Sequence, residues 1–209
     1  MTDTSGLSRS DATRARLLEV AIRAFAEKGY HGTTTRDIAA AAGMSSAALY
    51  VHHSSKEDLL SQISLNGHEK TLRIVRDAIA SSEDPAVALR QVVHDFVLDH
   101  ATYPTTARIV NYDLAALNPE HFQEILGIRR TIENAFQKLL ERGVAQGDFD
   151  APDPHMASVA LLSLGIDIGR WYREGTRWSP EQIANHYADI ALRIVGAQSL
   201  TKLAEMSRP

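Results

Sequence analysis

Apolar residues recur at intervals of three and four along almost the whole chain, and this helical period is the feature that most limits its fold. One such stripe lies in the segment 18–25, and another runs through 183–194. The period-two alternation of a half-buried strand is hard to find anywhere. The sequence therefore predicts an all-α chain.

Glycine, proline and capping residues divide this pattern into nine predicted helices, three short ones followed by six longer ones. Thr34 with Asp37 and Ser54 with Glu57 have the spacing of capping boxes for the second and fourth helices. The tail after Gly196 is expected to fray. The predicted helices begin near Ser10, Thr34, Ser45, Ser54, Pro85, Pro104, Asn118, Pro154 and Pro180.

Composition limits the setting in which the protein works. The chain has 209 residues and is 44% hydrophobic, enough for one large domain or two small ones. It lacks cysteine, which suits a reducing cytosol, and its first residues include no apolar stretch of the kind that directs secretion. The longest nearly apolar run, 156–166, is too short to span a bilayer. We therefore expect a cytoplasmic protein.

Charge is unevenly divided along the chain. Residues 9–56 contain seven Lys and Arg against four Asp and Glu, whereas residues 57–209 contain 15 against 21. A basic N-terminal part joined to an acidic remainder indicates that only the first part meets a polyanion. Chance variation of surface charge is the alternative.

Two short helices joined by a glycine turn, behind a longer first helix, form the outline of a helix-turn-helix. Small residues in the second short helix allow its backbone to approach base edges, and Ala47 or Ala48 can touch a thymine methyl group. Leu49 is expected to point into the core. A compact three-helix unit whose small residues merely permit close packing is the alternative.

The stretch "FAEKGYHGTTTRDIAAAAGMSSAALYVHHSSKEDLL", residues 25–60, resembles the DNA-binding domain of the TetR family of transcriptional regulators. The resemblance implies a nine-helix TetR-like fold, with an N-terminal helix-turn-helix domain at 1–56 and a helical ligand-binding and dimerisation domain at 57–209. It also implies a homodimer, usually a repressor that a small molecule releases from DNA.

Carried over by position, Arg36 matches a site that reads guanine in some members, and its planar fork suits the O6 and N7 atoms. Three departures stand out: Ala47 replaces a common glycine, Val51 a frequent aromatic residue, and His53 a usual phenylalanine. His53 is either a pH sensor or a neutral, partly buried filler. The residues expected at bases or phosphates are Thr35, Arg36, Ser45, Ser46, Ala47, Tyr50, His52 and Lys56.

The eighth predicted helix is apolar on more than one side, which indicates burial on more than one side, and the ninth carries one apolar stripe. Two such helices can form half of an intermolecular four-helix bundle and so give a twofold dimer. A dimer would combine two recognition helices about one DNA turn (~34 Å) apart. An ordinary intrachain core is the alternative. The predicted interface residues are Val159, Leu162, Ile166, Ile183, Tyr187, Ile190 and Ile194.

Aromatic and polar residues of the middle helices are candidates for an apolar effector pocket, and plain core positions are the alternative. The segment 169–195 resembles TetR regulators that respond to acyl-CoA thioesters, which implies cations for phosphates and an aromatic ring for adenine. The resulting ligand candidates are Phe96, His100, Tyr103, Tyr112, Phe122, Arg129, Arg170 and Trp171.

No catalytic motif appears in the sequence, and neither an enzyme activity nor a cofactor is predicted. His94, Asp95 and Asp99 lie close enough in sequence to hold a cation with His155, but a solvated polar face explains the same spacing. We therefore predict a DNA-binding regulator, a homodimeric repressor whose effector is a small hydrophobic or acyl-CoA-type molecule. An all-α lipid-binding protein without DNA function is the alternative.

Overall fold

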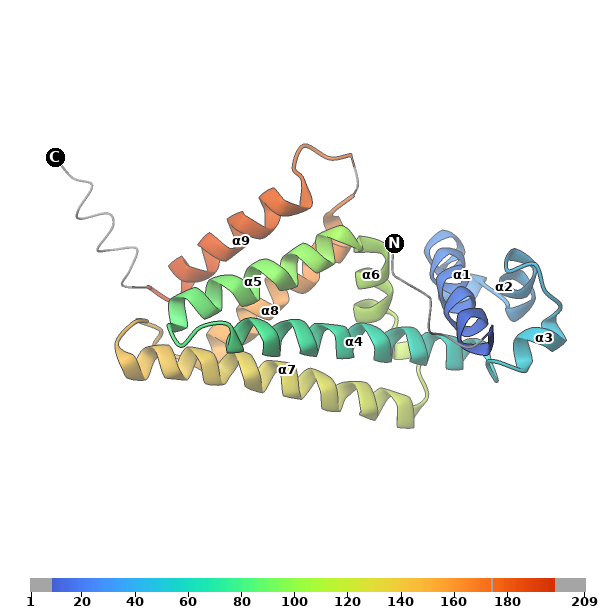
Figure 1. Cartoon of the computed structure of the whole chain (residues 1–209), viewed down its shortest axis with the longest axis horizontal. Coiled ribbons are helices and arrows are strands. Elements are labelled where there is room, and N and C mark those ends of the chain that lie inside the picture. The colour runs from blue at the N-terminus through green and yellow to red at the C-terminus, as the bar shows by residue number, and fades with distance from the viewer. Residues whose placement is uncertain (1–8, 174, 198–209) are drawn as a thin grey trace. The chain divides into compact units, whose positions relative to one another are not determined.

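In the computed structural model, residues 9–173 and 175–197 are described, and within them the chain forms nine α-helices, one short 3-10 helix and no strand (Figure 1). The prediction of an all-α chain is thereby confirmed. The predicted fraying concerns residues that lie mostly outside the described ranges. The elements are α1 (Arg9–Gly32), α2 (Thr35–Ala41), α3 (Ser46–Tyr50), α4 (Lys56–Ala80), α5 (Pro85–Thr102), α6 (Pro104–Tyr112), η1 (Leu114–Ala116), α7 (Pro119–Gln146), α8 (Pro154–Trp171) and α9 (Pro180–Ile194).

The chain divides into two compact units. One comprises residues 1–67 and 108–125, and the other comprises 68–107 and 126–209. The helices α4, α6 and α7 each contribute to both units. The division differs from the predicted boundary at residue 56, because Ile109 and Val110 of α6 pack into the core of the N-terminal unit.

The N-terminal unit is built around a small apolar core to which α1, α2, α3, α4 and α6 all contribute. Two glycines with left-handed backbone shape its turns: Gly29 (φ 74°) ends the regular part of α1, and Gly43 (φ 70°) follows α2. The predicted capping box of α2 is present, with Thr34 and Asp37 bonding each other's backbone amides. The core residues include Leu17, Phe25, Ile38, Leu49, Leu59, Leu60 and Ile63.

The second unit is organised around α5, which packs against both α8 and α9. Its apolar face supplies Leu89, Val92 and Val97 to a continuous core. The contact between α5 and α8 is close: a Cβ added at Gly165 would lie 2.4 Å from the ring of Phe96. Glycine is therefore the residue that lets the aromatic ring lie against the backbone of α8.

The start of α4 differs from the prediction. The expected capping box of Ser54 with Glu57 is wrong. Instead Ser55 Oγ accepts from the Asp58 amide (2.9 Å), and Asp58 Oδ2 accepts from the Ser54 amide (2.8 Å). Asp58, and not Glu57, therefore caps α4.

Among the described helices, none is long and apolar enough to cross a membrane.

Candidate functional site

On the outer surface of α2 and α3, several of the residues that the sequence predicts to contact DNA are exposed. Leu49 is completely buried, whereas Ser45 and Ala47 are exposed and Ser46 is half-buried. Arg36, at the second position of α2, is also exposed. Because the side chains at positions 45–48 are small and at least partly exposed, a base edge can approach the helix backbone closely there.

Local hydrogen bonds hold this short helix in place. Ser45 Oγ accepts from the Ala48 amide (3.2 Å), so the serine hydroxyl keeps its proton for another acceptor. The hydroxyls of Thr35 and Tyr50 lie 3.1 Å apart and join the start of α2 to the end of α3. The two predicted phosphate-contacting hydroxyls therefore form one polar edge.

Lys56 is engaged within its own unit. Its ammonium group donates to the carbonyl oxygens of Tyr30 (2.7 Å) and Thr33 (2.9 Å) and lies 4.2 Å from the centroid of the Tyr30 ring. One ammonium hydrogen is left for a phosphate, so the phosphate contact stays a prediction. The sequence did not reveal the structural role, because the two carbonyls belong to residues more than 20 positions away.

His53 is buried behind the recognition helix, with 5% of its surface exposed. Its Nδ1 lies 3.5 Å from Asp58 Oδ2, and its Nε2 has no hydrogen-bond partner among the described residues. Burial lowers the pKa of His53, although Asp58 acts in the opposite direction. These observations favour the interpretation of His53 as a neutral filler over that of a pH sensor.

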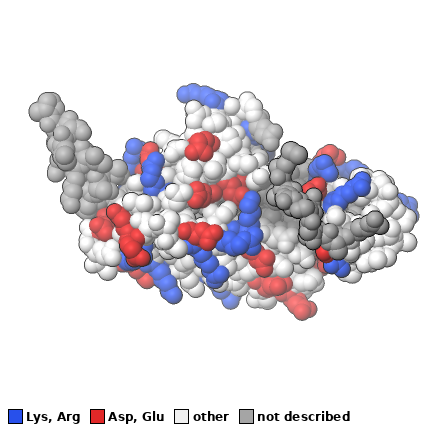
Figure 2. Space-filling view, viewed as in Figure 1, with Lys and Arg blue, Asp and Glu red and all other residues white. Residues whose placement is uncertain are grey.

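Charged side chains of both signs are interspersed over the face shown in Figure 2, without a continuous field of one sign. Some of the basic groups near the reading helices are paired: Lys28 Nζ lies 3.1 Å from Asp37 Oδ1. Hydrogen bonds from Thr34, followed by the one from Lys28, lower the pKa of Asp37 to about 2. Although residues 9–56 carry more Lys and Arg than Asp and Glu, the face shown in this view is therefore not uniformly basic.

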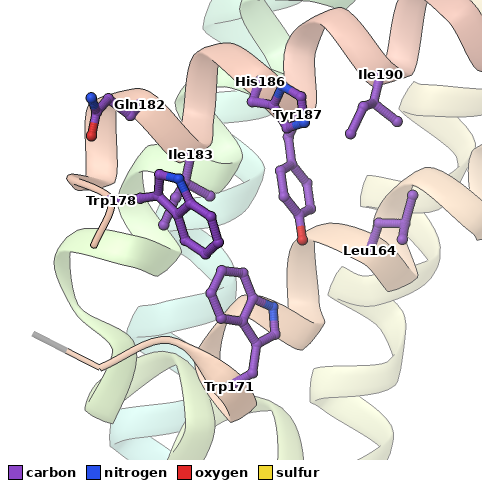
Figure 3. Close-up of a pocket in the computed structure, with 8 residues that line it drawn as sticks. All are labelled: Leu164, Trp171, Trp178, Gln182, Ile183, His186, Tyr187 and Ile190. Atoms are coloured by element: carbon purple, nitrogen blue, oxygen red, sulfur yellow. The ribbon is translucent and has the colours of Figure 1, made fainter. Parts of the chain in front are cut away.

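The helices α8 and α9 carry exposed apolar side chains around a hollow of about 550 Å³ (Figure 3). Val159 is 37% and Ile194 40% exposed, while Leu162, Ile166, Tyr187 and Ile190 are half-buried. Ile183 is 4% exposed and belongs to the core of its own chain. The hollow, called the tryptophan hollow below, is lined by Leu164, Trp171, Trp178, Gln182, Ile183, His186, Tyr187 and Ile190.

Sequence reasoning assigned the lining of the tryptophan hollow to two different sites. Tyr187 and Ile190 were expected at a dimer interface and Trp171 at a ligand, yet all three face the same hollow (Figure 3). Trp178 comes from the segment between α8 and α9, and its ring faces that of Trp171 in the view. The helical period does not identify Trp178 as a lining residue, because it lies outside both helices.

The predicted ligand residues do not form one described site. Tyr112 and Phe122 belong to the N-terminal unit, whereas the other six belong to the second unit. Phe96 and His100 are buried with their rings 4.3 Å apart. Tyr103 is 55% exposed beneath the ammonium of Lys70, and Arg170 pairs with Asp167 on the surface (2.7 Å).

Arg129 has a neighbour that sequence reasoning missed. Its Nη1 lies 3.3 Å from Nε2 of His68, a residue of α4 that is 4% exposed. Because a guanidinium only donates, His68 accepts at Nε2 and is neutral there. Burial lowers the pKa of Arg129, and the charge of Glu133 acts in the opposite direction. The pair places polar groups inside a largely apolar unit.

The candidate cation ligands are dispersed. His94 contacts Asp95 (2.9 Å) and Glu181 (3.0 Å), Asp99 pairs with Lys70, and His155 contacts Gln137 (3.1 Å). Within residues 9–173 and 175–197, no three His, Asp or Glu side chains come together as a metal site. The structure therefore favours the solvated polar face over a metal site.

Comparison with known protein families finds a match for both the N-terminal and the C-terminal part of the chain. Residues 17–63 match "Bacterial regulatory proteins, tetR family", and residues 82–195 match "Tetracyclin repressor-like, C-terminal domain". The chain belongs to the TetR family. It is a DNA-binding transcriptional regulator and not an enzyme, as the sequence predicted.

Several TetR relatives resemble the chain over nearly its whole length. The HTH-type transcriptional repressor KstR2 of Rhodococcus jostii is 30% identical over 91% of this chain and 93% of its own. A crystal structure of a tetR-family regulatory protein from Rhodococcus RHA1 is 40% identical, with a TM-score of 0.85 over 91% of this chain and 99% of that one. The ketosteroid transcriptional regulator KstR2 of Mycobacterium tuberculosis is 26% identical, with a TM-score of 0.78 over 91% and 97% of the two chains.

His53 provides a pH-dependent test of the TetR recognition unit. A group whose pKa is lowered by folding binds protons more readily in the unfolded chain, so stability falls as the pH drops through its unfolded pKa of about 6.5. We expect His53→Phe to remove this part of the pH dependence, measured by urea unfolding at pH 7.5 and pH 5.5. His52→Gln is the control. An equal loss of stability in wild type and His53→Phe would contradict the assignment.

Proposed function

We propose that the protein is a homodimeric repressor whose operator is read by α2 and α3. The observation that carries this proposal is the row of small side chains on α3, which are at least partly exposed at 46–48 while Leu49 behind them is fully buried. Arg36 can read a guanine, and Ser45, Ser46 and Ala47 can face bases. Thr35, Tyr50, His52 and the remaining hydrogen of Lys56 are the proposed phosphate contacts. The alternative of a lipid-binding protein without DNA function has no structural support, since the core and caps of this unit are intact.

We propose further that α8 and α9 of two copies pack together and cover the tryptophan hollow. Val159 and Ile194 are apolar side chains that water contacts in the single chain, at 37% and 40% exposure. Tyr187 and Ile190, which line the hollow, share one stripe of α9 with Ile194 at helical spacing. Removing such a surface from water is the main driving force of association. A twofold dimer would then present the helices α2 and α3 of both copies to one operator.

The proposed effector is a hydrophobic molecule that carries a carbonyl or anionic group, such as an acyl-CoA or a steroid derivative. Support comes from the second unit, where the partly buried Arg129 pairs with the buried His68 and His100 lies against Phe96. An arginine suits carboxylate, phosphate or thioester oxygens. The relatives named for ketosteroid regulation agree with a large apolar ligand. Ligand binding would release DNA if it favours a geometry with lower operator affinity.

Operator reading is tested by selecting genomic DNA fragments on the purified protein and measuring affinity over a salt series. We expect Arg36→Ala to relax base preference by about 1–3 kcal/mol at one position. Lys56→Gln should weaken all sequences similarly and lower the salt slope by about 1, because one phosphate contact is lost. Arg76→Gln, an exposed change on the distal part of α4, is the control. Failure to enrich any fragment at low salt would refute the DNA proposal.

The dimer is tested by placing a charge in the apolar face. We expect Val159→Asp to shift the protein toward monomer in sedimentation experiments, because the carboxylate would be buried without a partner. Val144→Asp on α7 is a matched control, since Val144 and Val159 are both 37% exposed. If both variants sediment like wild type, α8 does not form the interface.

The effector class is tested by thermal shift with acyl-CoAs, fatty acids, steroids and their neutral alcohol analogues. We expect an acyl-CoA or steroid acid to raise the melting temperature of wild type and to weaken operator binding. Arg129→Gln should lose this response, whereas the exposed neighbour Arg130→Gln should keep it. If the two variants respond equally to these compounds, Arg129 does not belong to the ligand site.

A further inference from the structure

The first turn of α4 carries two adjacent charged residues that hold different parts of the N-terminal unit. Lys56 bonds the carbonyls of Tyr30 and Thr33, at the end of α1 and just before α2. Glu57 instead reaches the start of α7, 61 residues further along the chain. The reading helices and the first turn of α7 are therefore tied to neighbouring positions on one helix.

The contact at the start of α7 is an ordered polar cluster. Glu57 Oε1 accepts from the Asn118 amide (2.9 Å) and lies 2.9 Å from Nδ1 of His121, while Oε2 accepts from Asn118 Nδ2 (3.3 Å). Asn118 caps the helix, because its Oδ1 accepts from the His121 amide (2.9 Å). Since a carboxylate only accepts, His121 donates at Nδ1.

Charge strengthens this cluster. The hydrogen bond that His121 donates to Glu57 raises the pKa of His121, burial opposes the rise, and the charges of Glu57, Glu120 and Asp58 add to it. The Glu57 carboxylate also lies beside the N-terminus of the 28-residue α7, where the helix dipole favours an anion. Both side chains remain partly accessible, at 31% for His121 and 23% for Glu57.

Continuity of the helices gives this cluster a role beyond capping. Both α4 and α7 begin in the N-terminal unit and continue into the second unit. We propose that Glu57 and His121 are positioning residues that transmit movement of α7 to the DNA-reading helices, by way of Lys56. The inference rests on the proposed function, because it assumes that a ligand in the second unit controls operator binding. A purely capping role would stabilise α7 without responding to DNA.

The distinguishing measurement is hydrogen exchange with and without the selected operator fragment. In wild type we expect operator binding to slow exchange of amides 119–124 by at least about threefold, in addition to protecting 35–50. Glu57→Gln and His121→Gln should each abolish the effect at 119–124 while leaving the protection of 35–50. The double variant should show the same exchange at 119–124 as each single variant, because either substitution alone removes the contact between Glu57 and His121. Glu124→Gln, an exposed change one helical turn further along α7, is the control and should behave as wild type.

A pH series tests the link in the unaltered chain, so the inference stays testable if a variant folds poorly. Raising the pH through the elevated pKa of His121 removes its charge. After correction for intrinsic exchange, the protection of 119–124 by operator should therefore be smaller at pH 8.5 than at pH 6, while His121→Gln should show no such change.

The possible outcomes separate this inference from the proposed function. If operator binds but never alters exchange at 119–124, or if the glutamine variants keep the effect, Glu57 and His121 only cap α7 and the inference is overturned. If wild type captures no operator at all, the proposed function itself fails and the coupling role fails with it.

Discussion

The reading surface depends on the burial of one leucine. A helix of five residues, Ser46–Tyr50, forms too few backbone hydrogen bonds to persist alone in water. Leu49 anchors it, fully buried in a core shared with Phe25 and Ile38. With that anchor and the Ser45 cap in place, the outward positions are free to be small. The same arrangement explains how a segment poor in large apolar and charged residues can be well ordered and still face outward.

The first turn of α4 connects this small core to the start of α7 through polar contacts. Apolar packing would hold the elements together without a defined direction, whereas the Lys56 and Glu57 bonds fix particular atoms. Such bonds are partly accessible to water and can break without opening the core. A regulator that must move its reading helices while keeping them folded is well served by a junction of this kind.

Local signals predicted the helices well, because helix ends are decided by neighbouring residues. Thr34 with Asp37 caps α2, and Ser179 with Gln182 caps α9 in the same reciprocal way. The start of α4 shows where this reasoning fails. Two serines precede two carboxylates there, and the local pattern cannot choose between them. Contacts with α7 decide which carboxylate caps α4. Asn118 and His121, at the start of α7, bind the Glu57 carboxylate, and Asp58 caps α4 instead.

The sequence by itself determined the all-α class, the helix-turn-helix, the family and the inward direction of Leu49. The all-α class and the inward direction of Leu49 follow from residues a few positions apart, within the reach of a helical turn, whereas the family follows from the resemblance of residues 25–60 to the TetR DNA-binding domain. Only the tertiary structure decided that Lys56 binds two carbonyls, that His68 lies beside Arg129, and that Trp178 shares a hollow with Trp171. Most of these pairs join residues 20 or more positions apart, and their meeting depends on how helices pack, which the helical period does not specify.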